Sequence, residues 1–366
     1  MLCRFSSVLP SLPGALSLIP SAARGPRRGS RPAVSLRPQF AVVVTRVSLP
    51  RVHNIAVRGY VGVTDQGWYE FLRSHPEQTE VNFWRPRDKS RFGAIIPGEY
   101  FFFKLKASVH NLVVGGGVFV GWELVPLSAA WEFYGYGNGA ASLDELRALI
   151  GGLNPLGPGD DPEIGCVLLK DVIFFDDAGI AGPPPEFARN IVQGRTYELD
   201  DPRYGGYFDI LTAQLEGQVV ELGQGGPSWR HHGPMFSDRF TRVRLGQNGF
   251  RTTIFNAYHR RCAITGTKIW PALDAAHIRP VAQGGEHRID NGLLLRSDVH
   301  TMFDRGYLGV DPSHRLQVSP RLRDEFGNGE QFYSKIGEVI ALPDRKTDRP
   351  YREFLEWHLD TVFRAS

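Results

Sequence analysis

Residues 273–306 read LDAAHIRPVAQGGEHRIDNGLLLRSDVHTMFDRG, and this run sets the architecture of the carboxy-terminal part of the chain. Two short apolar runs, 273–281 and 292–296, have the length and composition of β-strands. A loop separates them, and a helix is predicted to begin near Ser297. The predicted order is therefore strand, loop, strand, helix.

Four polar side chains stand out in this unit by type and spacing. His277 ends the first predicted strand, Asn291 precedes the second, and His300 and Asp304 lie one turn apart on the helix. That spacing places His300 and Asp304 on one helical face, where an imidazole and a carboxylate suit a divalent ion such as Mg²⁺, Mn²⁺ or Zn²⁺. A neutral histidine opposite the ion can deprotonate a water for attack on phosphorus, and an asparagine can hold the loop and the imidazole.

The distribution of charge points to the same part of the chain. The 366 residues carry a formal net charge of +3. Lys and Arg counted against Asp and Glu give +6 for residues 1–40, −8 for 41–228, +8 for 229–323 and −3 for 324–366. A cationic segment within an otherwise acidic body favours contact with phosphates.

The run 273–306 resembles the ββα-metal fold of the HNH endonuclease family, in the subgroup associated with bacterial restriction enzymes. With the preceding helix and RRCAITG, the resemblance covers about 95 residues. It implies that His277 is the general base and Asn291 the orienting residue. It also implies that His300 and Asp304 bind a divalent metal ion, Mg²⁺ or Mn²⁺, with Zn²⁺ or Ni²⁺ as alternatives.

Two positions depart from the family pattern. Many HNH enzymes place a metal ligand immediately before the base, whereas this chain has Ala276; Asp274, two positions earlier, is the candidate for that ligand. Many relatives also hold a structural zinc with two C-x-x-C pairs, whereas the corresponding CAIT has Cys262 and Thr265. No structural zinc is therefore expected.

Other basic and imidazole side chains near the motif have weaker claims to a role. Arginines that flank the motif are candidates for phosphate contacts, foremost Arg279 and Arg296, and also Arg288 and Arg305. Each of them alone is equally compatible with an ordinary surface charge. The remaining histidines of this region are predicted to be surface or core residues: His231, His232, His287, His314 and His358.

Short β-rich runs separated by Gly, Pro and Asn turn signals occupy the first half of the chain. They are AVVVTRVSL (41–49), HNIAVRGYVGV (53–63), EYFFFKLKA (99–107), NLVVGGGVFVGWELV (111–125) and IGCVLLKDVIFF (164–175). Strands at this spacing predict a small barrel or sandwich, with the triple glycine 115–117 as a bulge or tight turn. Helices are predicted over 67–76 and over 142–153, where Ser142 opens a capping box. The run 207–216 is interpreted as a last short strand.

Residues 80–125, EVNFWRPRDKSRFGAIIPGEYFFFKLKASVHNLVVGGGVFVGWELV, are similar to PUA-superfamily readers of the EVE, ASCH and SRA kind. The resemblance covers about residues 41–220. In such readers a flipped base enters a pocket and stacks on aromatic side chains. The candidate pocket residues are Phe83, Trp84 and Arg85, followed by Trp131, Phe133, Tyr134 and Tyr136.

The predicted fold class is α+β, a PUA-like β-barrel with flanking helices followed by a ββα-metal nuclease domain. The predicted segments are a disordered basic tail (1–40), the reader (41–220), a linker (221–245), the HNH domain (246–323) and a closing helical region (324–366). For the acid-free tail, a transit peptide, a secretory signal and a non-native upstream start stay open. No apolar run reaches the roughly 18 residues of a membrane span, and a bacterial cytoplasmic protein is expected.

The two resemblances together imply a restriction-type endonuclease that cleaves double-stranded DNA carrying a modified base, with a modified cytosine favoured. An endonuclease that reads unmodified sequence is one alternative. A non-catalytic nucleic-acid-binding module is the other, and the missing ligand before His277 favours it. Cutting both strands with one site per chain suggests a homodimer.

Overall fold

The computed structural model describes residues 57–86, 90–153, 155–157, 159–204, 206–221 and 245–365. The predicted tail 1–40, the first β-rich run and nearly all of the predicted linker 221–245 lie outside the described residues. The described residues belong to one compact unit, His53–Ser366. None of their helices combines the length and the apolar character that a membrane span requires.

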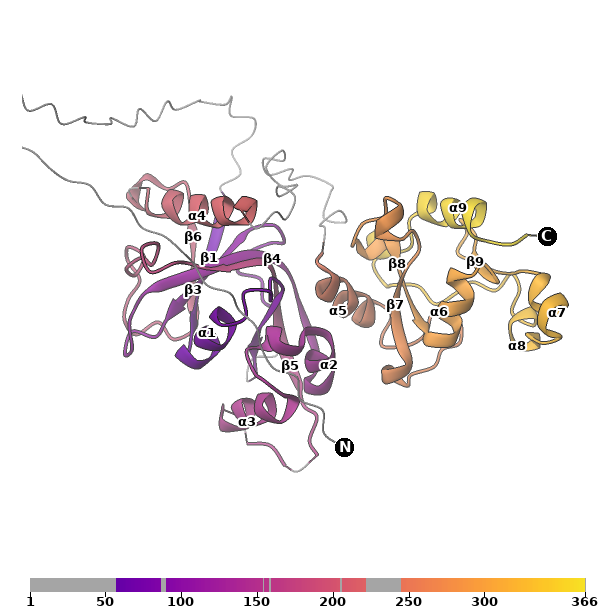
Figure 1. The fold of residues 1–366 in the computed structure, drawn as a ribbon, viewed down its shortest axis with the longest axis horizontal. Helices are drawn as coiled ribbons and strands as arrows, with labels where there is room; N and C mark the ends of the chain where they lie inside the picture. The colour runs from indigo at the N-terminus through magenta and orange to yellow at the C-terminus, as the bar shows by residue number, and fades with distance from the viewer. Residues whose placement is uncertain are drawn as a thin grey trace, which may run out of the picture. The chain divides into compact units, whose positions relative to one another are not determined.

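In the described residues, six strands form one mixed sheet in the order β2-β5-β4-β3-β1-β6 (Figure 1). They are β1 (Arg58–Thr64), β2 (Val81–Arg85), β3 (Tyr100–Leu105), β4 (Val113–Pro126), β5 (Glu163–Phe174) and β6 (Gly194–Glu198). All neighbours run antiparallel except β1 and β3, which are parallel. Within the described chain, β2 and β6 are the end strands of this sheet.

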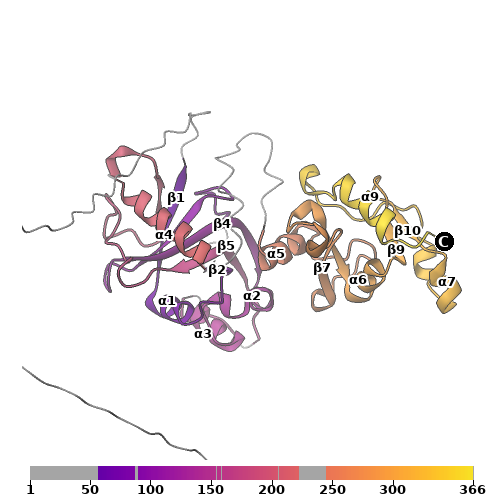
Figure 2. The ribbon, with the colours of Figure 1, turned by 45° about the horizontal axis from the view of Figure 1, so that its top comes forward.

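Strand β3 shows how both faces of the sheet are buried. Because successive side chains of a strand point to opposite faces, Phe101 and Phe103 pack on one side and Phe102 on the other. Helix α1 (Gln66–Arg73) covers the first face and α4 (Tyr207–Glu221) the second, as Figures 1 and 2 show. Together with the helical carboxy-terminal part, this sheet confirms the α+β fold class.

The prediction of a short strand over residues 207–216 is wrong, because this stretch begins α4. Phe208, Leu211 and Leu215 are buried, and their spacing repeats with the period of a helix. The last strand of the sheet is instead β6, which pairs with β1 and carries few apolar residues.

The triple glycine lies inside β4 and allows its neighbours to approach closely. A Cβ on Gly115 would lie 2.4 Å from the carbonyl oxygen of Ile173, and one on Gly116 would lie 2.7 Å from that of Phe101. The pairing of β4 with β5 shifts register just after Gly116, which confirms the predicted bulge.

The predicted capping box opens helix α3 (Leu143–Leu153). The Glu145 backbone N–H donates to Ser142 Oγ at 3.1 Å, and Glu145 Oε2 accepts from the Ala141 N–H at 2.8 Å. Two backbone donors that the helix itself leaves unpaired are thereby satisfied.

The predicted strand, loop, strand, helix order is present in residues 273–304. β7 (Leu273–His277) pairs antiparallel with β8 (Gly292–Arg296), and α6 (Ser297–Asp304) follows directly. The surrounding elements are α5 (Gln247–Ala257), β9 (Leu308–Val310), β10 (Leu316–Val318), α7 (Arg321–Phe326), α8 (Glu330–Tyr333) and α9 (Arg352–Thr361).

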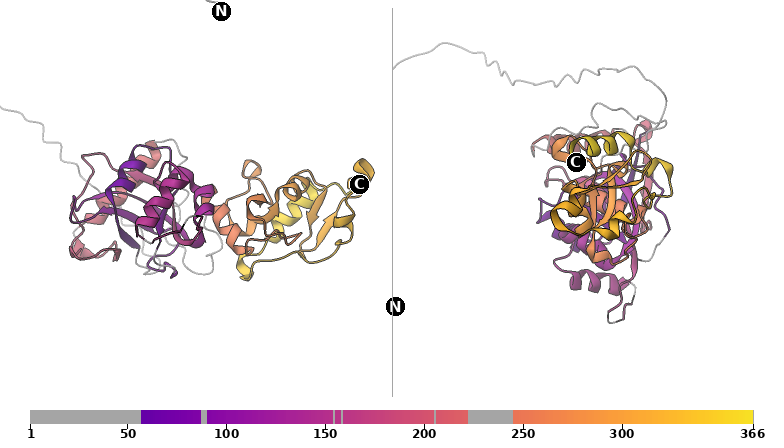
Figure 3. Two further views of the ribbon diagram at one scale, coloured as in Figure 1. Left: turned by 90° about the horizontal axis from the view of Figure 1, so that it is seen from below. Right: turned by 90° about the vertical axis from the view of Figure 1, so that its right-hand side faces the viewer.

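The predicted closing helix is α9. Its Phe354 and Leu355 are buried, and the helix packs on β9, as the yellow helix among the orange strands in Figure 3 shows. A Cβ on Gly309 of β9 would lie 2.9 Å from Leu359, so the glycine lets the helix approach the strand closely.

Helix α5 belongs to a hydrophobic core that includes both the sheet and the ββα unit. Phe255 packs edge-on against Phe133 of α2 (Leu127–Tyr134), with ring centroids 5.3 Å apart. On the other side, Phe250 and Ile254 pack over Gly292 of β8. The side chains of this helix therefore contact both parts of the chain.

Candidate active site

His277 ends β7, and its imidazole is held by two aromatic neighbours. Phe250 stacks on the imidazole with ring centroids 4.0 Å apart and an interplanar angle of 11°. Nε2 of His277 lies 3.1 Å from Nδ1 of His287. Burial, followed by the charges of His287 and His300, lowers the pKa of His277 to about 4. The imidazole is therefore neutral at neutral pH and has a nitrogen able to accept a proton.

Asn291 is fully buried and holds the loop between β7 and β8. Its Oδ1 accepts from the backbone N–H of Arg279, and its Nδ2 donates to the carbonyl oxygens of Arg279 and Glu286, all at 2.9 Å. The backbone N–H of Ile278 donates to the Asn291 carbonyl at 2.9 Å. Asn291 thus fixes the two residues that follow His277, while Phe250 and His287 contact the imidazole itself.

Asp274 and Asp304 both contact His300, whose charge acts on His277. His300 Nδ1 is 3.4 Å from Asp274 Oδ2, and His300 Nε2 is 3.3 Å from Asp304 Oδ2. Partial burial, and to a smaller extent the Asp274 carboxylate, raises the pKa of Asp304, while His300 opposes that rise. Two carboxylates thus face one imidazole at a partly exposed site, and a bound cation would stabilise both.

The chemistry of these donors fits a divalent cation. Carboxylate oxygens and an imidazole nitrogen are ligands that Mg²⁺, Mn²⁺ and Zn²⁺ accept in proteins. Among the residues that the structure describes, no group of three or more Asp, Glu, His or Cys side chains is arranged so that it could hold a metal ion. Ala276, directly before His277, is fully buried, so Asp274 is the β7 residue that brings a carboxylate to His300.

A pocket of about 310 Å³ lies between β1 and β2 of the sheet. It is lined by aromatic residues, including Phe83 and Trp84, and by polar residues, including Arg85, Thr64, Asp65, Lys106 and Gln193. Arg85 donates to Gln193 Oε1 at 3.2 Å, and both residues line the pocket. The Trp84 indole N–H is already bonded to the carbonyl oxygen of Asn138 at 2.8 Å.

The prediction that Trp131 and Tyr134 line the same pocket is wrong, because neither is among its lining residues. After β4 the chain enters α2, which packs against α5 and directs its aromatic side chains into that core. Tyr134 is buried there, and so is Phe133. Tyr136 is 44% exposed and contacts His75 instead.

Residues 262–311 match the HNH endonuclease family. These residues form an HNH endonuclease domain. The domain contains His277, Asn291, His300 and Asp304, together with Asp274. An HNH endonuclease domain indicates a nuclease, which is a phosphodiester hydrolase.

Solved structures that are similar to the chain include the following two. A mutant ZmASCH protein from Zymomonas mobilis is 12% identical with a TM-score of 0.24, covering 45% of this chain and 97% of that chain. The modification-dependent TagI restriction endonuclease is 13% identical with a TM-score of 0.23, covering 78% of this chain and 75% of that chain. At these TM-scores the two structures say nothing further about this chain. A comparison with curated proteins gave no match.

The sequence predicts His287 to be an ordinary surface or core residue, whereas in the structure its imidazole contacts His277. His287 belongs to the loop that Asn291 closes, and this loop carries its Nδ1 to within 3.1 Å of His277. Burial, followed by the charge of Lys170, lowers the pKa of His287, so both imidazoles are neutral at neutral pH. One can therefore donate a hydrogen bond to the other and fix its tautomer.

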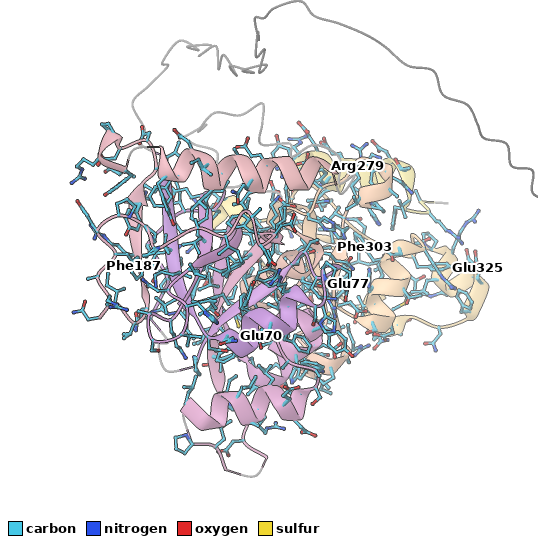
Figure 4. The ribbon with its side chains drawn as sticks, turned by 60° about the vertical axis from the view of Figure 1, so that its left-hand side comes forward. Glu70, Glu77, Phe187, Arg279, Phe303 and Glu325 are labelled. Atoms are coloured by element: carbon cyan, nitrogen blue, oxygen red, sulfur yellow. The ribbon has the colours of Figure 1, made fainter. Side chains whose placement is uncertain are left out.

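Three of the four arginines that flank the motif have protein partners. Arg279 Nε donates to the Gln283 carbonyl at 2.7 Å, and its guanidinium lies 5.4 Å from the Trp357 ring (Arg279 is labelled in Figure 4). Arg296 binds both carboxylate oxygens of Asp298, at 2.6 and 2.8 Å. Phosphate contact by Arg279 or Arg296 stays a prediction.

Arg288 is nearly buried and is bound by groups of the protein itself. It is only 9% exposed, its Nε donates to Asp290 Oδ1 at 2.9 Å, and its guanidinium lies 5.2 Å from the Phe354 ring. Arg288 thus holds the loop of the HNH domain against α9.

The free energy of unfolding is expected to fall as the pH drops from about 6.5, the ordinary pKa of histidine, towards about 4. Burial lowers the pKa of both His277 and His358 to about 4. Between these pH values the unfolded chain binds more protons than the folded chain, so acid favours unfolding. Urea unfolding at several pH values measures the slope.

The variant His358→Phe isolates one of these two histidines. His358 stacks on Phe303 with centroids 3.8 Å apart (Phe303 is labelled in Figure 4), so a phenyl ring keeps the contact and removes the titrating group. A weaker pH dependence is expected in this variant. An unchanged slope would contradict the assignment of the acid sensitivity to His358.

Proposed function

We propose that this chain is a metal-dependent DNA endonuclease of restriction type with His277 as general base. The observation that supports it best is the pairing of His300 with Asp274 and Asp304, together with the neutral His277 on which the charge of His300 acts. Metal-assisted hydrolysis of a phosphodiester uses ligands that hold a divalent cation and a general base that activates water.

In this reaction His277 takes a proton from a water molecule whose oxygen attacks the phosphorus. The new P–O bond forms as the bond to the leaving 3′ oxygen breaks. Phe250 and His287 hold the imidazole plane during proton transfer, and Asn291 holds the loop behind it. A divalent cation held by His300 and Asp304, with Asp274 as the candidate for a further ligand, would supply positive charge for the phosphate and the leaving oxygen.

In the same proposal, the pocket between β1 and β2 accepts a base turned out of the DNA duplex. Its volume of about 310 Å³ is at the small end of ligand pockets, and its wall combines the Phe83 ring with polar groups. Aromatic faces stack on an extruded base, and polar groups read its edge. A modified cytosine is the base we favour, so that the pocket selects the DNA and the HNH domain cuts it.

Cleavage of plasmids that differ only in their cytosine and adenine modifications tests the proposal. Purified protein with Mg²⁺, Mn²⁺ or Ni²⁺ is expected to cut a modified plasmid and to leave the bare plasmid intact. Equal cleavage of both would favour an endonuclease that reads unmodified sequence. No cleavage of any plasmid, together with no metal binding in calorimetry, would favour a non-catalytic DNA-binding module.

Cutting both strands calls for two copies of the chain, so a homodimer on DNA is expected. Sedimentation of the protein with DNA measures whether this homodimer forms.

Replacing Phe83 by leucine is expected to reduce the preference for modified over bare DNA by about tenfold. The substitution keeps an apolar side chain against Phe101 but removes the aromatic face, and stacking on one base contributes about 1–3 kcal/mol. Competition binding with modified and bare duplexes measures the ratio.

Phe71→Leu is the matched control, because Phe71 packs on His75 and Tyr136 and does not line the pocket. It is expected to keep the wild-type preference. A wild-type preference in the Phe83 variant would place base recognition elsewhere.

A further inference from the structure

Glu80, the residue before β2, caps the first turn of α5. Its Oε1 accepts from the backbone N–H of Gln247 at 2.8 Å, and its Oε2 accepts from those of Asn248 at 2.9 Å and Gly249 at 3.3 Å. An α-helix leaves these N–H groups without partners, and the residue at its own N-cap, Gly246, has no side chain to bind them. The Glu80 carboxylate therefore accepts these hydrogen bonds. The helix dipole also favours negative charge at this end of the helix.

Gly246 makes room for that carboxylate. A Cβ at this position would lie 2.2 Å from Glu80 Cδ and 2.3 Å from Oε2. The backbone of Gly246, with φ −70° and ψ 176°, is one that any residue adopts, so the glycine serves the close approach and not the turn. A methyl group at Gly246 would displace the Glu80 carboxylate.

The capped turn carries the aromatic ring that stacks on His277. The Phe250 N–H donates to the Gly246 carbonyl at 2.8 Å, which places Phe250 in this first turn. Gly292, the strand partner of His277, leaves space for the ring, because its Cβ would lie 2.8 Å from Phe250 Cζ. The position of the ring over His277 thus depends on where the first turn of α5 lies.

The other end of α5 is held by separate contacts. Asn256 Nδ2 donates to Glu123 Oε2 at 2.7 Å, and Arg260, just beyond the helix, binds Glu163 at 2.6 Å. Loss of the Glu80 carboxylate would therefore loosen the first turn and leave the rest of the helix attached. Strand β2, which Glu80 precedes, also supplies Phe83 and Arg85 to the pocket.

We propose that Glu80 is a positioning residue of the nuclease reaction, which holds the first turn of α5 and thereby keeps the Phe250 ring against the His277 imidazole. Glu80 does not touch the reacting atoms. The inference rests on the proposed function, in which His277 is the base. It also makes β2 a direct link between the pocket and the HNH domain.

Steady-state cleavage by Glu80→Ala, Glu80→Gln and Gly246→Ala tests this inference. Glu80→Ala and Gly246→Ala are expected to lower kcat about tenfold, or about 1.4 kcal/mol, with KM for DNA within about twofold of wild type. Glu80→Gln keeps one acceptor oxygen and is expected to retain more activity. The control is Glu77→Ala, an exposed glutamate three positions earlier (Figure 4), which is expected to leave kcat unchanged.

A measurement without DNA separates this inference from the proposed function. A stacked phenyl ring shifts the NMR signals of the His277 imidazole, and Phe250→Leu identifies that shift. Folded Glu80→Ala and Gly246→Ala proteins are expected to lose part of it, even if the wild type cuts no DNA. An unchanged His277 signal or an unchanged kcat in these folded variants would overturn the inference, and so would a raised KM alone.

Discussion

His277→Ala is expected to reduce DNA cleavage by a factor of about 10² to 10⁴, the range that a positioned general base contributes. Binding of DNA is expected to stay within about twofold, because proton transfer matters in the transition state and not in the bound complex. Single-turnover cleavage with saturating enzyme, alongside a binding titration, measures the two effects separately.

The control for this variant is His259→Asn, which lies just after α5. The His259 side chain is 61% exposed and pairs with Asp344 at 3.2 Å, away from the residues assigned to the reaction. Asparagine tolerates its positive φ of 53°. Wild-type cleavage is expected for this control, and near-wild-type cleavage by His277→Ala would refute the assigned base.

Asp304→Asn is expected to abolish tight binding of Mn²⁺ and to reduce cleavage by about a hundredfold or more, because an amide replaces an anionic ligand. The metal-free protein is not expected to lose stability. Burial, and to a smaller extent Asp274, raises the pKa of Asp304, so the charge that the variant removes is unfavourable in the folded protein. Calorimetric titration with Mn²⁺ and thermal unfolding without metal measure the two effects.

The affinity for the metal is also expected to rise with pH across the titration of Asp304. A raised pKa means that this carboxyl keeps its proton to a higher pH than usual, and a cation must displace that proton. Asp360→Asn, on the exposed side of α9, is the control for both measurements. Metal binding by Asp304→Asn at wild-type affinity would remove Asp304 from the ligand set.

The sequence could predict which residues of the HNH domain lie close together because their contacts are local, whereas their roles stay a prediction. Asp274, His277, His300 and Asp304 are brought together by two paired strands and the next helix, and residue spacing is enough to place them. The prediction missed Phe250, because its contact with His277 depends on how α5 packs.

The first part of the chain was harder to predict because its contacts join distant segments. Phe83 and Arg85 line the pocket between β1 and β2, whereas Trp131 and Tyr134 turn into the core with α2. Their order in the sequence does not say on which side of the sheet a helix will pack. The link from Glu80 to α5 has no local sequence signal, because its two ends lie far apart along the chain.

The packing of α5 bears on how this HNH domain could be fused to a different protein. A chimaera that takes only residues 262–366 leaves behind the phenyl ring over the proposed base. One that begins at Gln247 keeps the ring but exposes the helix face that met α2 and loses the carboxylate partners supplied by Glu80 and Glu123. An HNH domain that is to be fused to another protein therefore needs α5. The new protein must also offer a surface that replaces the contacts of α5 with Glu80, Glu123 and α2.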